Sequence, residues 1–240
     1  NLDCLDFIKC PDDQLPLFNG SSENFFKQLD EYLITRTSKK KVENIIGGLF
    51  KFKHKNHLVF FDVTQPPRKK FSKCYQSGPL SFEYFLDGVK VISNSGFGNN
   101  ISKKAELISR LTACQSTLTL NDTSVSKFER NKLINKVFGN SIKDSFKIHN
   151  LNFNNEKNII SCSAEHNGYE KKFGCMHKRE VFLDKENNYL KGSDYIFKKK
   201  DGIPIRYVFR FHINPELTVV KTMSGNSALI QLSKNKSLIF

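Results

Sequence analysis

The stretch SFEYFLDGVKVISNSG, residues 81–96, decides the fold class of this chain. Two short apolar runs, SFEYFL and VKVIS, flank the dipeptide Asp87-Gly88. Asp-Gly between apolar runs is a strong short-range signal for a two-residue hairpin, because both turn positions need a positive φ that these residues adopt readily. The stretch therefore predicts two antiparallel strands joined by a tight turn.

The same pattern recurs along most of the chain. Further predicted hairpins are 47–63 with a turn near Asn56, 145–168 with a turn at Asn154-Asn155, and 178–199 with a turn at Asn187-Asn188. Residues 116–128 alternate as one strand, and 205–240 carry three or four more. Roughly a dozen short strands predict a mainly β protein, a large antiparallel β-sandwich of the supersandwich type. Only residues 129–138 interrupt the pattern, as a loop or a short helix.

The N-terminal part has a different period. Residues 1–20 contain prolines and an Asn-Gly pair, which indicate irregular structure. Residues 21–36 follow a helical stripe, with a serine as the N-cap and apolar residues at steps of three and four. We therefore expect a short helical linker segment over 1–46, the remnant of a junction to another domain, followed by the sandwich over 47–240.

The balance of charge is strongly basic, with a formal net charge of +14 and a pI near 9.5. Such a charge favours a polyanionic partner. Lysine, asparagine, isoleucine and phenylalanine are all abundant, so a compositional bias of the genome is an equally simple explanation. The chain has no sequence signature of a nucleic-acid-binding fold, so we expect no nucleic-acid partner.

The six cysteines are scattered and form no CxxC pair. We interpret them as small buried apolar residues rather than as a disulfide framework or a zinc site. No apolar run is long enough to span a bilayer. The chain begins at Asn1 rather than at methionine, so we expect a fragment of a longer protein whose leader would lie upstream.

Five stretches in a fixed order carry a resemblance to a known family. They are SGPLSFEYFLDGVKVISNSG, SRLTACQSTLTLNDTSVSKF, AEHNGYEKKFGCMHKREVFLD, LKGSDYI and FRFHINP. In this order they resemble the C-terminal β-sandwich of the heparinase II/III family of polysaccharide lyases, in the alphaproteobacterial heparinase II/III-like form. Each stretch alone is a weak signal, and their common order makes the resemblance specific.

The resemblance implies an activity and a partner domain. Proteins of this family join an N-terminal (α/α) toroid to the sandwich and cleave uronate-containing anionic polysaccharides by β-elimination. The toroid is missing from this chain, together with the tyrosine that the family uses for proton transfer. The resemblance also implies the periplasm or cell envelope as the location. Some members hold a structural zinc ion with histidine and aspartate side chains of the sandwich.

This chain departs from the family at the residues that titrate. When the two are aligned on Leu80 to Glu83, the base position of the family falls on Gln76 and the first residue of its HAH-type motif on Cys74. Two further family positions, an aspartate and a histidine, fall on Asn94 and Gln115. Amides are neither general bases nor preferred zinc ligands. We therefore expect no metal and no cofactor, with the three amides contacting sugar hydroxyls as substrate-binding residues.

Five other residues are candidates for the site. His166 and Tyr169 lie beside an Asn-Gly turn. They are either residues that transfer protons or contact sugar, or side chains that pack locally in the turn. His177 and Arg179 alternate along one strand and so share a face. They could bind a substrate carboxylate, lie on a solvated face, or form a buried pair between the sheets. Arg110 matches a basic residue of the family and is a further substrate-binding candidate.

Two functions remain open from the sequence. The first is the C-terminal domain of a polysaccharide lyase that supplies substrate contacts, active in the full-length protein and inactive in this chain alone. The second is a catalytically degenerate, glycan-binding or structural member of the family. The loss of titrating residues favours the second function, and the retained pattern around the arginine, histidine and tyrosine candidates favours the first.

Overall fold

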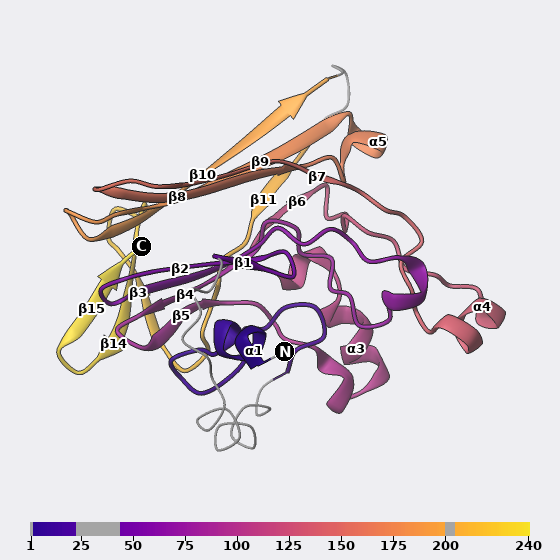
Figure 1. Ribbon diagram of the computed structural model, residues 1–240, viewed down its shortest axis with the longest axis horizontal. Coiled ribbons are helices and arrows are strands. Elements are labelled where there is room, and N and C mark those ends of the chain that lie inside the picture. Colours follow the sequence, from indigo (N-terminus) through magenta and orange to yellow (C-terminus); the bar gives the residue numbers. More distant parts are fainter. Residues whose placement is uncertain (1, 23–43, 200–204) are drawn as a thin grey trace.

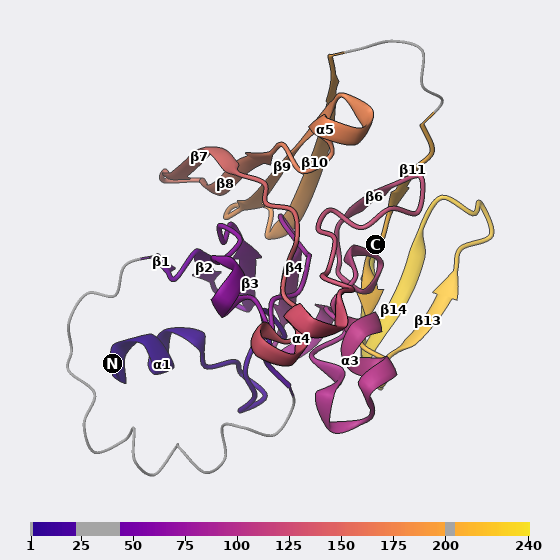
Figure 2. The same cartoon turned by 90° about the vertical axis from the view of Figure 1, so that its right-hand side faces the viewer.

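The computed structural model describes residues 2–22, 44–199 and 205–240 of the chain. Two antiparallel sheets lie face to face and form the sandwich (Figure 1). One has six strands in the order β1-β2-β3-β4-β5-β12, and the other has four in the order β10-β9-β8-β7. A two-stranded sheet, β11-β6, and a three-stranded sheet, β13-β14-β15, lie beside these two sheets (Figure 2). The predicted mainly β, antiparallel sandwich is confirmed.

The described parts contain fifteen strands and a few short helices. The strands are β1 Ile45–Ile46, β2 Leu49–His54, β3 His57–Asp62, β4 Phe82–Leu86, β5 Val89–Ser93, β6 Leu118–Leu120, β7 Ile148–Asn155, β8 Ile159–His166, β9 Cys175–Asp184, β10 Tyr189–Lys198, β11 Tyr207–Phe209, β12 His212–Ile213, β13 Thr218–Lys221, β14 Ala228–Ser233 and β15 Lys236–Ile239. The helices are α1 Leu2–Ile8, α3 Lys103–Ser109, α4 Lys132–Phe138 and α5 Glu170–Phe173, with the 3₁₀ turns η1 Lys69–Phe71, η2 Gly98–Asn100 and η3 Thr112–Cys114.

The hairpin that decides the fold class forms as the sequence predicts. Asp87 and Gly88 have φ values of 53° and 80° and connect β4 to β5. The turns near Asn56 and at Asn187-Asn188 also connect neighbouring strands. The turn predicted at Asn154-Asn155 is wrong, because both residues pair with β8 and the chain reverses over 156–158 instead. Their place at the end of a solvent-facing edge strand explains the polar composition that suggested a turn.

Both faces of the six-stranded sheet are buried. The inner face packs on the four-stranded sheet in the main core, to which Phe61, Phe82 and Val181 belong. The outer face meets the N-terminal segment, where Phe7 of α1 packs with Phe60. A strand covered on both faces needs a continuous apolar run, which explains the buried sequence HLVFFD of β3.

The N-terminal region differs in part from its prediction. Residues 2–8 form α1 where irregular structure was expected. The helix predicted over 21–36 lies almost entirely outside the described residues. The first strand of the sandwich starts at Ile45, so the boundary expected after residue 46 falls just inside the sheet. The segment 129–138 contains α4, which confirms the short-helix alternative.

The longest loops gather with α3 and α4 at one end of the sandwich (Figure 1). The hairpin turns after β2, β4 and β9 lie toward the opposite end (Figure 1). The loop end contains residues 72–80, which lead into β4, and residues 110–117, which lead into β6. Residues 94–97, which follow β5, lie at the same end. This arrangement brings together residues from three loops that are far apart in the sequence.

Candidate functional site

A cluster of three buried amides lies at the loop end. The Gln76 side chain donates from Nε2 to the carbonyl oxygens of Gly96 at 2.9 Å and Ser109 at 3.1 Å. Its Oε1 accepts a hydrogen bond from the backbone N–H of Gly20 at 3.0 Å. Gln115 donates from Nε2 to the same Ser109 carbonyl at 2.8 Å. One carbonyl oxygen thus ties two amides, and with them two loops, to the end of α3.

The third amide completes the cluster. Asn94 accepts at Oδ1 from the backbone N–H of Ser116 at 2.8 Å. Space is tight around these side chains, because a Cβ at Gly78 would lie 2.7 Å from Cγ of Gln115. All three amides are buried. Substrate contact by them stays a prediction, and it would require these loop contacts to break.

The residues of this cluster do not fit a zinc ion. The amide nitrogens of Gln76 and Gln115 donate to carbonyl oxygens, the amide nitrogen of Asn94 has no hydrogen-bond partner among the described residues, and an amide nitrogen is not a metal ligand. Zinc prefers thiolate, imidazole and carboxylate ligands. Within the described residues there is no group of three or more such side chains that could hold a metal ion. The absence of zinc stays a prediction that metal analysis can check.

Arg110 follows α3 and is completely buried. Its guanidinium donates to three backbone carbonyls, those of Tyr75 at 2.9 Å, Ser72 at 2.8 Å and Asn140 at 2.5 Å. The ring of Phe128 lies 4.2 Å from the guanidinium carbon. Burial lowers the pKa of Arg110 to about 10, which still leaves it charged near neutral pH. Arg110 therefore holds the loop 72–77 in place, and its contact with substrate remains untested.

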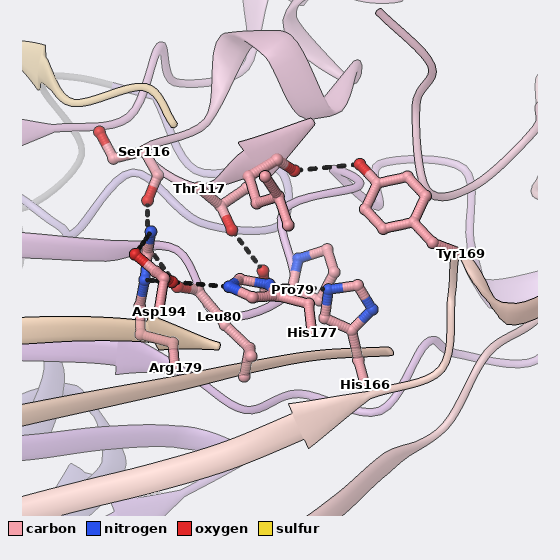
Figure 3. A network of polar contacts seen from close by, with 10 residues as sticks. Pro79, Leu80, Ser116, Thr117, His166, Tyr169, His177, Arg179 and Asp194 are labelled. Atoms are coloured by element: carbon pink, nitrogen blue, oxygen red, sulfur yellow. Dashed lines mark hydrogen bonds and ion pairs between the residues drawn. The ribbon is translucent and has the colours of Figure 1, made fainter. Parts of the chain in front are cut away.

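A chain of polar side chains runs between the two sheets (Figure 3). Nε2 of His166 lies 3.2 Å from Nδ1 of His177, and Nε2 of His177 lies 2.6 Å from Oδ1 of Asp194. Arg179 donates from Nε to Oδ1 of Asp194 at 2.8 Å and from Nη2 to Oδ2 at 3.0 Å. The residues come from β8, β9 and β10, at facing positions of one sheet.

The hydrogen bonds fix the tautomers along this chain. The backbone N–H of Gly168 donates to Nδ1 of His166, so His166 carries its proton on Nε2 and donates to His177. His177 then carries its own proton on Nε2 and donates to Asp194. Burial lowers the pKa of both histidines, that of His166 well below its ordinary value with the help of neighbouring His177 and Arg179. We therefore expect both rings to be neutral near pH 7.

The Asp194 carboxylate is the charged end of this chain. Burial raises its pKa, but the hydrogen bond from His177 and the Arg179 guanidinium outweigh burial and lower the pKa to about 2. Arg179 also donates from Nη1 to the carbonyls of Leu80 at 2.9 Å and Ser116 at 2.8 Å. These carbonyls belong to loops of the opposite layer. Arg179 therefore connects the two layers, and the buried-pair alternative describes His177 and Arg179 in this structure.

Tyr169 is buried beside this chain and bonds elsewhere. Its hydroxyl, at the end of the ring drawn in Figure 3, lies 3.0 Å from the carbonyl oxygen of Leu118. The carbonyl oxygen of Thr123 lies 3.2 Å from the same hydroxyl. Burial raises the pKa of the phenol well above its ordinary value. His166 and Tyr169 are close, with ring centroids 5.7 Å apart, but neither faces solvent. The geometry matches the packed-turn alternative, and proton transfer by this pair stays an untested prediction.

The neutral histidines predict a loss of stability in mild acid. In the unfolded chain each imidazole gains a proton below about pH 6.5, whereas His166 and His177 stay neutral when folded, so stability falls as the pH drops through that value. Asp62 offsets part of the loss, because burial raises its pKa to about 6 and the folded state protonates it first. We expect the free energy of unfolding to be about 2 kcal/mol lower at about pH 5.5 than at about pH 7.

Urea unfolding followed by circular dichroism at the two pH values measures this difference. A free energy of unfolding that is equal at both, or higher in acid, would contradict the neutral state assigned to the two rings.

Sequence reasoning missed two acidic residues that organise these clusters. Asp194 lies within the stretch LKGSDYI, on the strand next to Arg179, which is the signal that could have found it. Glu83 is fully buried, accepts the backbone N–H of Asn94 at 3.0 Å and lies 3.9 Å from Nζ of Lys90. Burial raises the pKa of Glu83, and the Lys90 ammonium opposes that shift.

The fold is a large antiparallel β-sandwich whose buried polar clusters connect its loops and its two layers. Residues 45–240 match the family described as Heparinase II/III-like, C-terminal. The chain belongs to this family, as the resemblance implied. No curated protein matched the sequence.

Solved structures show the same fold. The heparan sulfate lyase HepC from Pedobacter heparinus is similar with a TM-score of 0.69 at 17% identity, over 98% of this chain and 37% of that one. A heparinase III crystal structure has a TM-score of 0.67 at 14% identity, over 99% of this chain and 40% of that one. The heparinase III described as the BT4657 gene product has a TM-score of 0.64 at 16% identity, over 92% and 35%. The chain thus spans well under half the length of these relatives.

Proposed function

We propose that this chain is the C-terminal domain of a polysaccharide lyase that acts on uronate-containing anionic polysaccharides by β-elimination. The observation that carries the proposal is the family match over 45–240. The similar solved structures, named as a heparan sulfate lyase and as heparinase III, support it. A location in the periplasm or cell envelope belongs to the same proposal. None of the described helices is long and apolar enough to cross a membrane.

The chemistry assigns the proton transfer to another domain. β-Elimination must neutralise the uronate carboxylate, remove the C5 proton with a positioned base and protonate the leaving oxygen. Gln76 is an amide, and His166 and His177 are buried and hydrogen-bonded. We therefore assign the base to an N-terminal (α/α) toroid of the same protein. The sandwich contributes substrate contacts, and this chain alone is inactive.

A basic groove at the loop end is the proposed contact with the polysaccharide. It encloses about 1220 Å³ between α3, α4 and the loop that joins β6 to α4. Lys127, Arg130 and Lys143 line it together with Asn131 and Asn135, among other residues. Cations suit the sulfate and carboxylate groups of an anionic glycan, and amides suit its hydroxyls. Arg130 and Lys143 form no ion pair with another described residue.

The outer side of α4 is the proposed contact with the toroid. Leu133 and Val137 are 76% and 74% exposed and lie one turn apart on this helix. Exposed apolar residues grouped in this way mark interaction surfaces. Because the groove lies at the same end of the sandwich, a domain that packs on α4 would face the glycan held in the groove.

The test compares the full-length protein with this 240-residue chain on several uronate polysaccharides. The readout is the ultraviolet absorbance of the unsaturated uronate that β-elimination creates. We expect the absorbance to rise with the full-length protein alone. The double variant Arg130→Glu/Lys143→Glu should raise KM about tenfold through lost charge attraction. The matched control Lys55→Glu/Lys157→Glu, on exposed hairpin turns at the other end, should change KM less than twofold.

The three amides favour a second candidate, a degenerate member of the family that binds glycans without cleaving them. A flat trace on every substrate, from a folded full-length protein that still binds anionic polysaccharide, would establish this alternative. If Arg130→Glu/Lys143→Glu cleaves polysaccharide with an unchanged KM, the protein is a lyase but the groove between α3 and α4 is not where the substrate binds.

A further inference from the structure

A cavity of about 550 Å³ lies between the two layers, on the side where β15 adjoins the sandwich. Its walls are mostly apolar and aromatic and include Phe82, Leu190, Phe211, Leu238 and Phe240. Small-molecule sites typically enclose roughly 300 to 1,000 Å³ with apolar walls and few polar groups. The amide cluster and the basic groove at the loop end share no lining residue with it. The cavity is therefore separate from the surface proposed to contact polysaccharide.

One polar side chain with an unused hydrogen-bonding atom lines this cavity. His57 is 3% exposed, and its Nδ1 lies 2.8 Å from the hydroxyl of Tyr84. The phenol can donate to Nδ1, and in that tautomer the imidazole proton lies on Nε2. Nε2 is buried beside Asn188 but has no partner with hydrogen-bond geometry among the described residues. A buried N–H without a partner costs free energy and is rarely left so.

A glycine in the middle of a strand makes room for this cavity. Gly192 lies within the ten residues of β10, opposite Val181 of β9, and both line the cavity. A Cβ at this position would meet only the Glu180 carbonyl oxygen, at 3.9 Å. The φ of Gly192 is outside the range that requires glycine. Glycine weakens a strand and often marks a close approach of a ligand or another backbone. Neither backbone strain nor crowding requires it here.

The charged groups at this cavity either form ion pairs or, in the case of Lys191, lie over a ring on the outer face. Arg179 pairs with Asp194, and Lys236 pairs with Asp87 at the mouth. Lys191 lies over the outer ring of Phe182. A charged ligand would lose its hydration without gaining an unpaired counter-charge, which is unfavourable in an apolar site. A neutral ligand avoids this cost and can use the free N–H.

We infer that this cavity binds an uncharged, largely apolar small molecule that accepts one hydrogen bond, through a carbonyl or ether oxygen, from Nε2 of His57. The inference is independent of the lyase function, because it uses neither the groove nor the amide cluster. It explains the unpartnered imidazole and the strand glycine together.

Three diphenyl probes of similar size separate the parts of this proposal. Benzophenone has two rings and a carbonyl acceptor, diphenylmethane lacks the acceptor, and diphenylacetate adds a charge. Binding to the full-length protein, with the 240-residue chain alongside, is measured by calorimetry and by the shift in melting temperature. We expect benzophenone to bind about tenfold more tightly than diphenylmethane, because only it satisfies the buried N–H. We expect no binding of diphenylacetate. Equal binding of the first two, or preferred binding of the acid, would overturn the assigned ligand class.

A matched pair of variants locates the ligand. Gly192→Phe should fill the cavity and abolish benzophenone binding, whereas Ser193→Phe, on the outer face of the same strand, should leave it unchanged. Benzophenone that binds Gly192→Phe with the wild-type affinity would overturn the site, as would the absence of binding by the wild-type protein. Nuclear Overhauser contacts between the ligand and the methyl groups of Leu238 and Ile239 in the wild-type protein provide a test without any variant. Contacts only to methyl groups of residues that do not line the cavity would also overturn it.

Discussion

Replacing Asp194 with alanine should lower the free energy of unfolding by about 3 to 5 kcal/mol, the usual cost of removing one partner of a buried ion pair. The change leaves the Arg179 guanidinium without its two carboxylate bonds and His177 without an acceptor for its Nε2 proton. Because folded domains have only about 5 to 15 kcal/mol of stability, the variant should unfold at a much lower urea concentration. Urea unfolding at neutral pH measures the effect.

A double-mutant cycle separates the ion pair from the cost of leaving one charge alone. Arg179→Met should also be strongly destabilising, because the Leu80 and Ser116 carbonyls then lose their donor. Arg179→Met/Asp194→Ala should lose clearly less than the sum of the two single changes, because it leaves neither charge buried alone. Additive losses, or a loss below about 1 kcal/mol for Asp194→Ala, would show that the two charges do not stabilise each other in the folded protein.

The hairpins were predictable because their signals are local. Asp87-Gly88 specifies its turn through φ values that few other residue pairs adopt easily. The turn after β7 was misplaced because asparagine is common both in turns and on a solvent-facing edge strand. Only pairing with Ser161 and Ile160, which lies beyond the local sequence, assigns Asn154 and Asn155 to the strand.

The candidate site was predictable in position but less so in environment. The family alignment put Gln76, Asn94 and Gln115 at related positions, and the structure brings these three loops together. Alternation also predicted that His177 and Arg179 share a face of their strand. A period of two cannot tell which face is buried, because the other face of β9 also carries charged residues. The contact with the carboxylate of Asp194 on β10 accounts for the burial of these two side chains. That contact depends on the register between β9 and β10, which the local sequence does not specify.

Replacing Arg110 with methionine should lower the free energy of unfolding by about 4 kcal/mol. Methionine keeps most of the apolar length, but the carbonyls of Tyr75 and Asn140 lose their donor, and the carbonyl of Ser72 keeps only the backbone N–H of Tyr75. Each buried polar group left without a partner costs about 1 to 3 kcal/mol. The loop 72–77 should then detach, so amide hydrogen exchange should speed up there first, while the β3–β4 pairing remains protected. Urea unfolding and hydrogen exchange measure the two effects.

The control for this variant is another arginine with a different environment. Arg206 is exposed and pairs with Asp122 at 3.2 Å, so Arg206→Met should cost at most about 1 kcal/mol. Arg110→Lys should fall between the two, because one ammonium cannot reach three carbonyls in the fixed geometry of a guanidinium. If Arg110→Met were as stable as Arg206→Met, with unchanged exchange in 72–77, the carbonyls would not depend on the guanidinium. The basic residue retained at position 110 would then be better explained by contact with an anionic substrate than by support of the loop.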